Sequence, residues 1–147
     1  MTNRSTQLIA CRLLATYAYA VDNGDPEILR RLFDTESEFA AVLKSGEHLV
    51  PPIVGRNGII AHFVAQRASR SFVRRHFVSN VKVRESTFRM IRAVAYVLVV
   101  DESTHGPMNR GMGLYDARLH RTVSGWRISD LVVRLDQDTY QQPIRDA

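Results

Sequence analysis

Apolar residues in the first part of the chain recur at three- and four-residue spacing, which predicts amphipathic helices. One helix is expected over residues 6–23, and a second over 26–33, where Asp25 and Pro26 supply a cap and a first-turn proline. A third is expected within residues 54–69, with Asn57 as its cap and Phe63 on its inner face. The first helix carries an apolar stripe that consists of Ala10, Leu14, Tyr17, Ala18 and Val21.

The second half of the chain changes to alternating segments rich in β-branched and aromatic residues, which predicts strands. Long strands are expected over 75–85, 88–101, 110–121 and 126–136, and shorter ones over 38–44 and 47–50, the last ended by Pro51 and Pro52. Helices followed by hairpin-connected strands imply an α+β fold. We expect a strongly curved antiparallel sheet around three helices, with an apolar cavity between them.

The length of 147 residues suits one domain, expected over 1–147 with a core at about 6–138 and a peripheral tail at 139–147. Hydrophobic residues make up 45% and charged residues 24%, and the one cysteine forms no disulfide within the chain. No apolar run has the length of a membrane span, and the first residues lack the apolar core of a secretion signal. A cytoplasmic protein without membrane attachment is the simplest expectation.

Positive charge is the other feature of the composition, with a formal net charge of +5. The densest arginine region runs from Arg67 through Arg70 to Arg74 and Arg75. No nucleic-acid-binding motif accompanies it, so no nucleic-acid partner is expected. The region favours either a solvated surface or a site that attracts an anionic small molecule.

Three ionisable residues lie in or beside apolar segments. Burying such a group costs free energy unless it has a hydrogen-bond or ion-pair partner, so its presence there indicates either such a partner or a functional role. Tyr17 fits either a core tyrosine or a hydroxyl donor to a substrate oxygen. Asp22, in the last turn of the first helix, fits either an exposed or turn-bound carboxylate or a desolvated one paired with a histidine. His76 begins a strand and fits either a structural residue or, once oriented by a carboxylate, a general acid or base.

Neighbouring positions complete the candidate pocket. Strand alternation places Val78 and Asn80 on the face of His76, and Tyr115 on a face of small and apolar residues. With Phe63 of the third helix, these are the candidate substrate-binding residues. No cluster of histidine, cysteine or carboxylate residues has the spacing of a metal site, and no phosphate-binding loop is visible, so neither a metal nor a cofactor is expected.

The order of these segments resembles the SnoaL-like branch of the NTF2-like superfamily, which includes scytalone dehydratase, bile-acid 7α-dehydratase and ketosteroid isomerase-like proteins. The resemblance rests on LLATYAYAVDNGDPEILRRLF, GRNGIIAHF, RRHFVSNVKV and GLYDARLHRTVSGWRISDLVVRLD. It implies a cone-like fold, and dehydratase residues at Tyr17, Asp22 and His76. Scytalone dehydratase has a second cavity histidine on a later strand, where this chain offers Met112, so a single-histidine mechanism is expected.

The resemblance implies a cofactor-independent dehydratase or isomerase that acts on a lipophilic cyclic hydroxy-ketone or a related carbonyl compound. It also implies a homodimer or a higher homo-oligomer. Two alternatives stay open, because members of one fold differ in function. One is a non-catalytic protein that binds a small apolar molecule, and the other is a small accessory subunit of a ring-hydroxylating dioxygenase.

Overall fold

Three helices form the first layer of the computed structural model, which describes residues 3–138. They are α1 (Arg4–Asn23), α2 (Pro26–Leu32) and α3 (Arg56–Ala68). The Asn3 side chain caps α1 by accepting the N–H of Thr6, and Gly24 ends it in the left-handed conformation that glycine tolerates, with φ 60°. Asp25 caps α2 as expected.

The start of α3 differs from the prediction. The helix begins after Gly55 without a side-chain cap, and Asn57 lies inside its first turn, where its Oδ1 accepts a hydrogen bond from Arg30. The expected peripheral tail over 139–147 lies outside the described residues.

Six strands form one sheet in the order β2-β1-β6-β5-β4-β3. Neighbours are antiparallel except β1 and β6, which run parallel. The predicted α+β class and curved sheet are thus confirmed, with one parallel pair in it. The strands are β1 (Phe33–Val42), β2 (His48–Val54), β3 (Arg74–Ser86), β4 (Met90–Ser103), β5 (Gly106–Thr122) and β6 (Gly125–Leu135).

Strand β2 continues through Pro51 and Pro52, although these prolines were expected to end it. It lies at one edge of the sheet, where a proline that lacks an N–H need not break the pairing with an inner strand. The register of β1 and β2 shifts at this point, between the pairs Phe39–Ile53 and Ala41–Val50.

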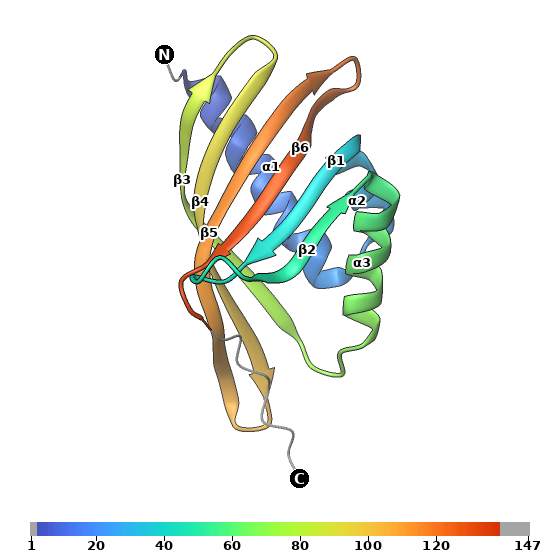
Figure 1. Ribbon diagram of the computed structural model, residues 1–147, viewed down its shortest axis with the longest axis vertical. Helices are drawn as coiled ribbons and strands as arrows, with labels where there is room; N and C mark the ends of the chain where they lie inside the picture. Colours follow the sequence, from blue (N-terminus) through green and yellow to red (C-terminus); the bar gives the residue numbers. More distant parts are fainter. Residues whose placement is uncertain (1–2, 139–147) are drawn as a thin grey trace.

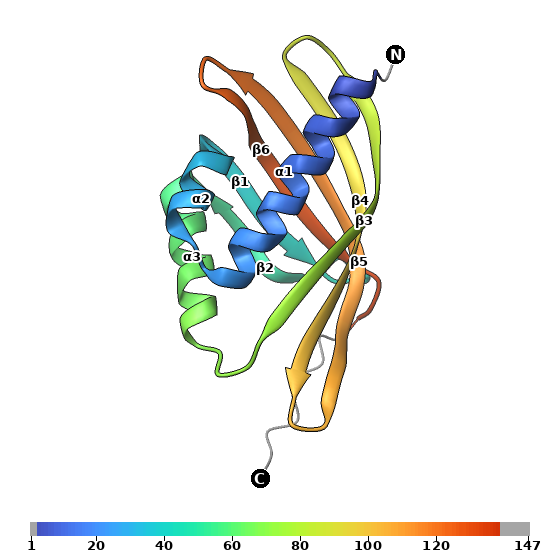
Figure 2. The ribbon, with the colours of Figure 1, turned by 180° about the vertical axis from the view of Figure 1, so that it is seen from behind.

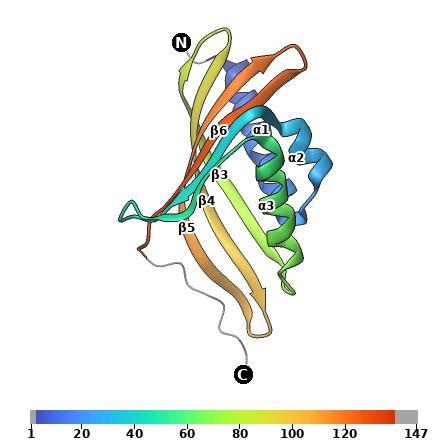
Figure 3. The same cartoon turned by 45° about the vertical axis from the view of Figure 1, so that its right-hand side comes forward.

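The helices cover one side of the sheet. Helix α1 crosses in front of strands β3 to β6 when the molecule is seen from behind (Figure 2), and α3 lies beside α1 on the same side (Figure 3). The β4–β5 hairpin extends past the helical layer (Figure 1). The buried core lies between these layers, where the α1 stripe meets alternate residues of β4, β5 and β6. None of the described helices has the length and hydropathy needed to cross a membrane.

Strand β3 contains a bulge that overturns one expectation. Between Ser79 and Lys82, β3 holds an extra residue relative to β4, and Asn80 takes a positive φ of 54°. Asparagine is among the few residues that adopt this conformation readily. The bulge reverses the alternation, so Asn80 is exposed while Val83 is buried. The prediction that Asn80 shares the face of His76 is therefore wrong.

Candidate functional site

Asp22 and His76 form a close pair between α1 and β3. The Nδ1 of His76 lies 2.5 Å from Oδ1 of Asp22, and the backbone N–H of His76 donates to Oδ2 at 3.0 Å. The Asp22 side chain is 7% exposed and that of His76 is 17% exposed. An ionised Asp22 would accept a proton held on Nδ1, so the other ring nitrogen, Nε2, would be left as a base.

The position of Asp22 follows from the sheet edge. Strand β3 is the last strand of the sheet, so half of its backbone groups have no neighbouring strand to pair with. Helix α1 lies along this edge and supplies side-chain partners: Asp22 accepts from His76, and Gln7 Nε2 donates to the carbonyl of Val81 at 2.7 Å. The Asp22 carboxylate thus contacts both the backbone N–H and the ring of His76. These two contacts offset the unfavourable interaction of a negative charge with the helix dipole in the last turn of α1.

Tyr17 lies five residues before Asp22 on the same helix and is buried. Its ring makes edge contacts with Phe33, Phe63 and Tyr115 at centroid separations of 6.0, 5.8 and 5.3 Å. Burial raises the pKa of the Tyr17 hydroxyl far above its ordinary value, and the negative charge of Asp22 raises it further. The hydroxyl therefore keeps its proton at neutral pH and can act as a donor.

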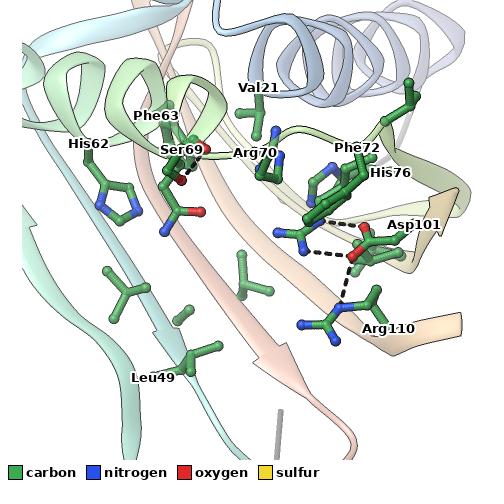
Figure 4. Close-up of a pocket in the computed structure, with 18 of the residues that line it drawn as sticks. Val21, Leu49, His62, Phe63, Ser69, Arg70, Phe72, His76, Asp101 and Arg110 are labelled. Atoms are coloured by element: carbon green, nitrogen blue, oxygen red, sulfur yellow. Dashed lines mark hydrogen bonds and ion pairs between the residues drawn. The ribbon is translucent and has the colours of Figure 1, made fainter. Parts of the chain in front are cut away.

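A pocket of about 1710 Å³ opens between the helices and the sheet. Of the predicted residues, Tyr17, Phe63, His76 and Tyr115 line it. Val78 packs against the core on the face of His76 and is not among the described residues that line the pocket. Figure 4 shows His76 on one side of the pocket, with Phe72 beside it, and His62 on the other.

Helix α3 supplies a second pocket histidine, His62, which is not among the candidate residues selected from the sequence. His62 contacts Phe39 and Phe63 with ring separations of 6.0 and 5.1 Å, and its partial burial lowers the pKa of the imidazole. Met112 is exposed and is not among the described residues that line the pocket, so this position contributes no group to it. However, the pocket contains two histidines, because α3 turns His62 inward beside Phe63.

Charged residues form a cluster at the His76 side of the pocket (Figure 4). Arg74 donates two hydrogen bonds to the carboxylate of Asp101, from Nε at 2.7 Å and from Nη2 at 2.9 Å. Nε of Arg110 lies 3.0 Å from the same carboxylate. Arg110 is 2% exposed because the β4–β5 register shifts around it, between the pairs Val100–Asn109 and Val99–Gly111. Among the described residues, no group of three or more histidine, cysteine and carboxylate side chains could hold a metal ion.

Comparison with known proteins identifies the family. Residues 9–132 match the SnoaL-like domain. The chain belongs to the SnoaL-like family. No curated protein matches the sequence.

Solved structures share the fold of this SnoaL-like chain. Two are from Novosphingobium aromaticivorans and cover 92% of both chains with a TM-score of 0.78: the beta subunit of a putative aromatic-ring-hydroxylating dioxygenase, at 15% identity, and a putative aromatic ring hydroxylase, at 24%. An NTF2-like protein with a cystatin-like fold from the same species has a TM-score of 0.77 at 21% identity, and the match covers 90% of this chain and 84% of that one. At these identities the likeness establishes the NTF2-like fold.

The lowered pKa of His62 predicts a pH-dependent contribution to the stability of this SnoaL-like domain. Below about pH 6.5 the unfolded chain binds a proton at this residue, while the folded protein does so only at lower pH. The free energy of unfolding should therefore fall as the pH decreases through this range. His62→Gln removes the proton site, so urea unfolding from pH 7.5 to 5 should show a shallower loss of stability. Parallel profiles for the two proteins would contradict the prediction.

Proposed function

We propose that the protein is a cofactor-independent dehydratase or isomerase that acts on a lipophilic cyclic hydroxy-ketone or a related carbonyl compound. The observation that carries the proposal is the His76–Asp22 pair, which places a carboxylate-bound histidine in the lining of the pocket. Carboxylate orientation of a histidine is a recurring way to make a general base that works near neutral pH.

Each residue would have a defined role. Nε2 of His76 would take a proton from the carbon alpha to the substrate carbonyl, and Asp22 would stabilise the resulting imidazolium through Nδ1–H. The Tyr17 hydroxyl would donate a hydrogen bond to the carbonyl oxygen, where negative charge develops as the enolate forms. In a dehydration, His76 would return the proton to the departing hydroxyl to release water. In an isomerisation, it would return the proton to another carbon.

The first step can be tested without the natural substrate. Proton NMR in D₂O measures exchange of the alpha protons of 2-tetralone, and the release of 1-naphthol measures dehydration of 3-hydroxy-1-tetralone. The wild-type protein should accelerate at least one of these reactions. Replacing His76 by Gln should lower that rate by roughly 10²-fold or more, the typical contribution of a general base.

His48→Gln is the matched control, because His48 is an exposed histidine outside the pocket. It should leave the rate unchanged. Retained activity in a correctly folded His76→Gln protein would remove the proposed mechanism. No acceleration by the wild-type protein would instead favour the non-catalytic alternative, in which the same pocket only holds an apolar ligand.

We also propose that the protein acts in the cytoplasm as a homodimer that uses the outer face of the sheet. Phe77 and Met112 lie on either side of Leu98 in the strand register, and all three are exposed. Phe77 and Leu98 also line an apolar groove of about 470 Å³. A continuous exposed apolar face is typical of an interaction surface.

Sedimentation equilibrium should therefore give twice the mass of the chain for the wild-type protein. Leu98→Lys should shift it to the monomer, while Val123→Lys, at an exposed hairpin tip, should leave the dimer intact. A wild-type monomer would favour the other alternative, an accessory subunit that needs a larger partner. The similarity to a putative dioxygenase beta subunit supports testing that alternative.

A further inference from the structure

We propose that Arg70 forms a carboxylate-binding subsite in the pocket, so that the ligand is an apolar compound bearing a carboxylate group. The inference deepens the proposed function, on which it rests, by naming the substrate class. Arg70 follows α3, in the segment that leads into β3, and it lines the pocket together with Arg74 and His76.

The guanidinium of Arg70 lacks the partners that such a group needs. Its Nε and Nη2 are shut off from water, and no hydrogen-bond acceptor among the described residues reaches them. A buried N–H without an acceptor is costly, and the cost is greater for a charged group. A ligand whose acceptor displaced the groups that cover this edge of Arg70 would remove the cost.

The two unpartnered nitrogens define the shape of the acceptor. In Arg74, the corresponding two nitrogens donate hydrogen bonds to both carboxylate oxygens of Asp101. This edge of a guanidinium presents two parallel N–H groups that match the two oxygens of a carboxylate. Arg74, four residues further along the chain, binds a carboxylate with this edge, and we expect the corresponding edge of Arg70 to bind a carboxylate of the ligand in the same way.

The surrounding charges favour an anion at this position. The positive charges of Arg74 and Arg67 repel the guanidinium of Arg70, and the negative charges of Asp101 and Asp22 attract it. Both acidic groups are already engaged, because Asp101 binds two arginines and Asp22 binds His76. Burial and the neighbouring arginines lower the pKa of Arg70. An added carboxylate would offset this excess of positive charge.

The rest of the pocket would hold the body of the ligand. Val97, Val99, Phe63 and Tyr115 line it with apolar or aromatic surface, and His76 lies on the same side as Arg70 (Figure 4). A carboxylate on Arg70 would fix one end of an apolar molecule and leave a carbon of its body near the histidine. This arrangement would restrict the poses that are open to the substrate.

Two fluorescent probes with one apolar body test the proposal: 1-pyrenebutyrate, which carries a carboxylate, and 1-pyrenebutanol, which does not. Fluorescence titration should show that the wild-type protein binds the carboxylate at least about tenfold more tightly than the alcohol, as expected for a charge-assisted hydrogen-bonded pair. Arg70→Met should abolish this preference and leave the affinity for the alcohol unchanged.

Arg84→Met is the matched control, because it removes the same charge from an exposed position on β3 that lines neither the pocket nor the apolar groove on the outer face. It should keep the wild-type preference. If Arg70→Met loses the alcohol as well, Arg70→Lys replaces it: this variant keeps the charge but lacks the two-pronged edge, and should still lose most of the preference.

The outcomes separate the two proposals. If the wild-type protein binds both probes equally, or Arg70→Met keeps the preference, the carboxylate subsite is wrong while the apolar pocket stands. If neither probe binds, the carboxylate subsite is contradicted, and the tetralone assay with His76→Gln alone decides the proposed function. Carbon-acid exchange that depends on His76, with no preference for the carboxylate, would overturn the subsite alone.

Discussion

The bond between Asp22 and His76 joins the end of helix α1 to the edge of the sheet. One carboxylate accepts both the backbone N–H and the ring of the same histidine. Loss of the carboxylate would leave a buried donor unpaired, at a cost of about 1–3 kcal/mol. The same contact fixes the direction of the imidazole. Structure and proposed chemistry therefore depend on one side chain, and a change that preserves the fold but rotates this carboxylate should remove the base.

The pocket combines this pair with two environments of different character. Toward α3, aromatic rings surround His62 and favour its neutral form. Toward β4 and β5, arginines outnumber the one carboxylate that they share, Asp101. Such a pocket suits a molecule with an apolar body and an acidic end. The apolar outer face of the sheet lies on the opposite side from the helices, so assembly and ligand binding can use separate surfaces.

Much of the fold could be predicted because helix periodicity and strand alternation are local. The burial of Tyr115 on β5 follows directly from alternation. The prediction fails where a strand gains a residue, as at Asn80, and Arg110 turns inward at a shift of the same kind. The partnership of Arg74 with Asp101 depends on strand register, which single-sequence patterns do not fix. Local pattern selected Asp22 and His76 as candidates and family resemblance gave them a shared role, but only the three-dimensional structure gives their separation.

The most direct test of the central contact is the proton position on His76. Nitrogen-15 NMR of the imidazole at neutral pH, with the signals assigned by comparison with His76→Gln, distinguishes the two neutral tautomers. The structure predicts a protonated Nδ1, held by Asp22, and an unprotonated Nε2, with Asp22→Asn disturbing that state. A neutral ring that carries its proton on Nε2 in the wild-type protein would contradict the account, since Nε2 could not then act as the base.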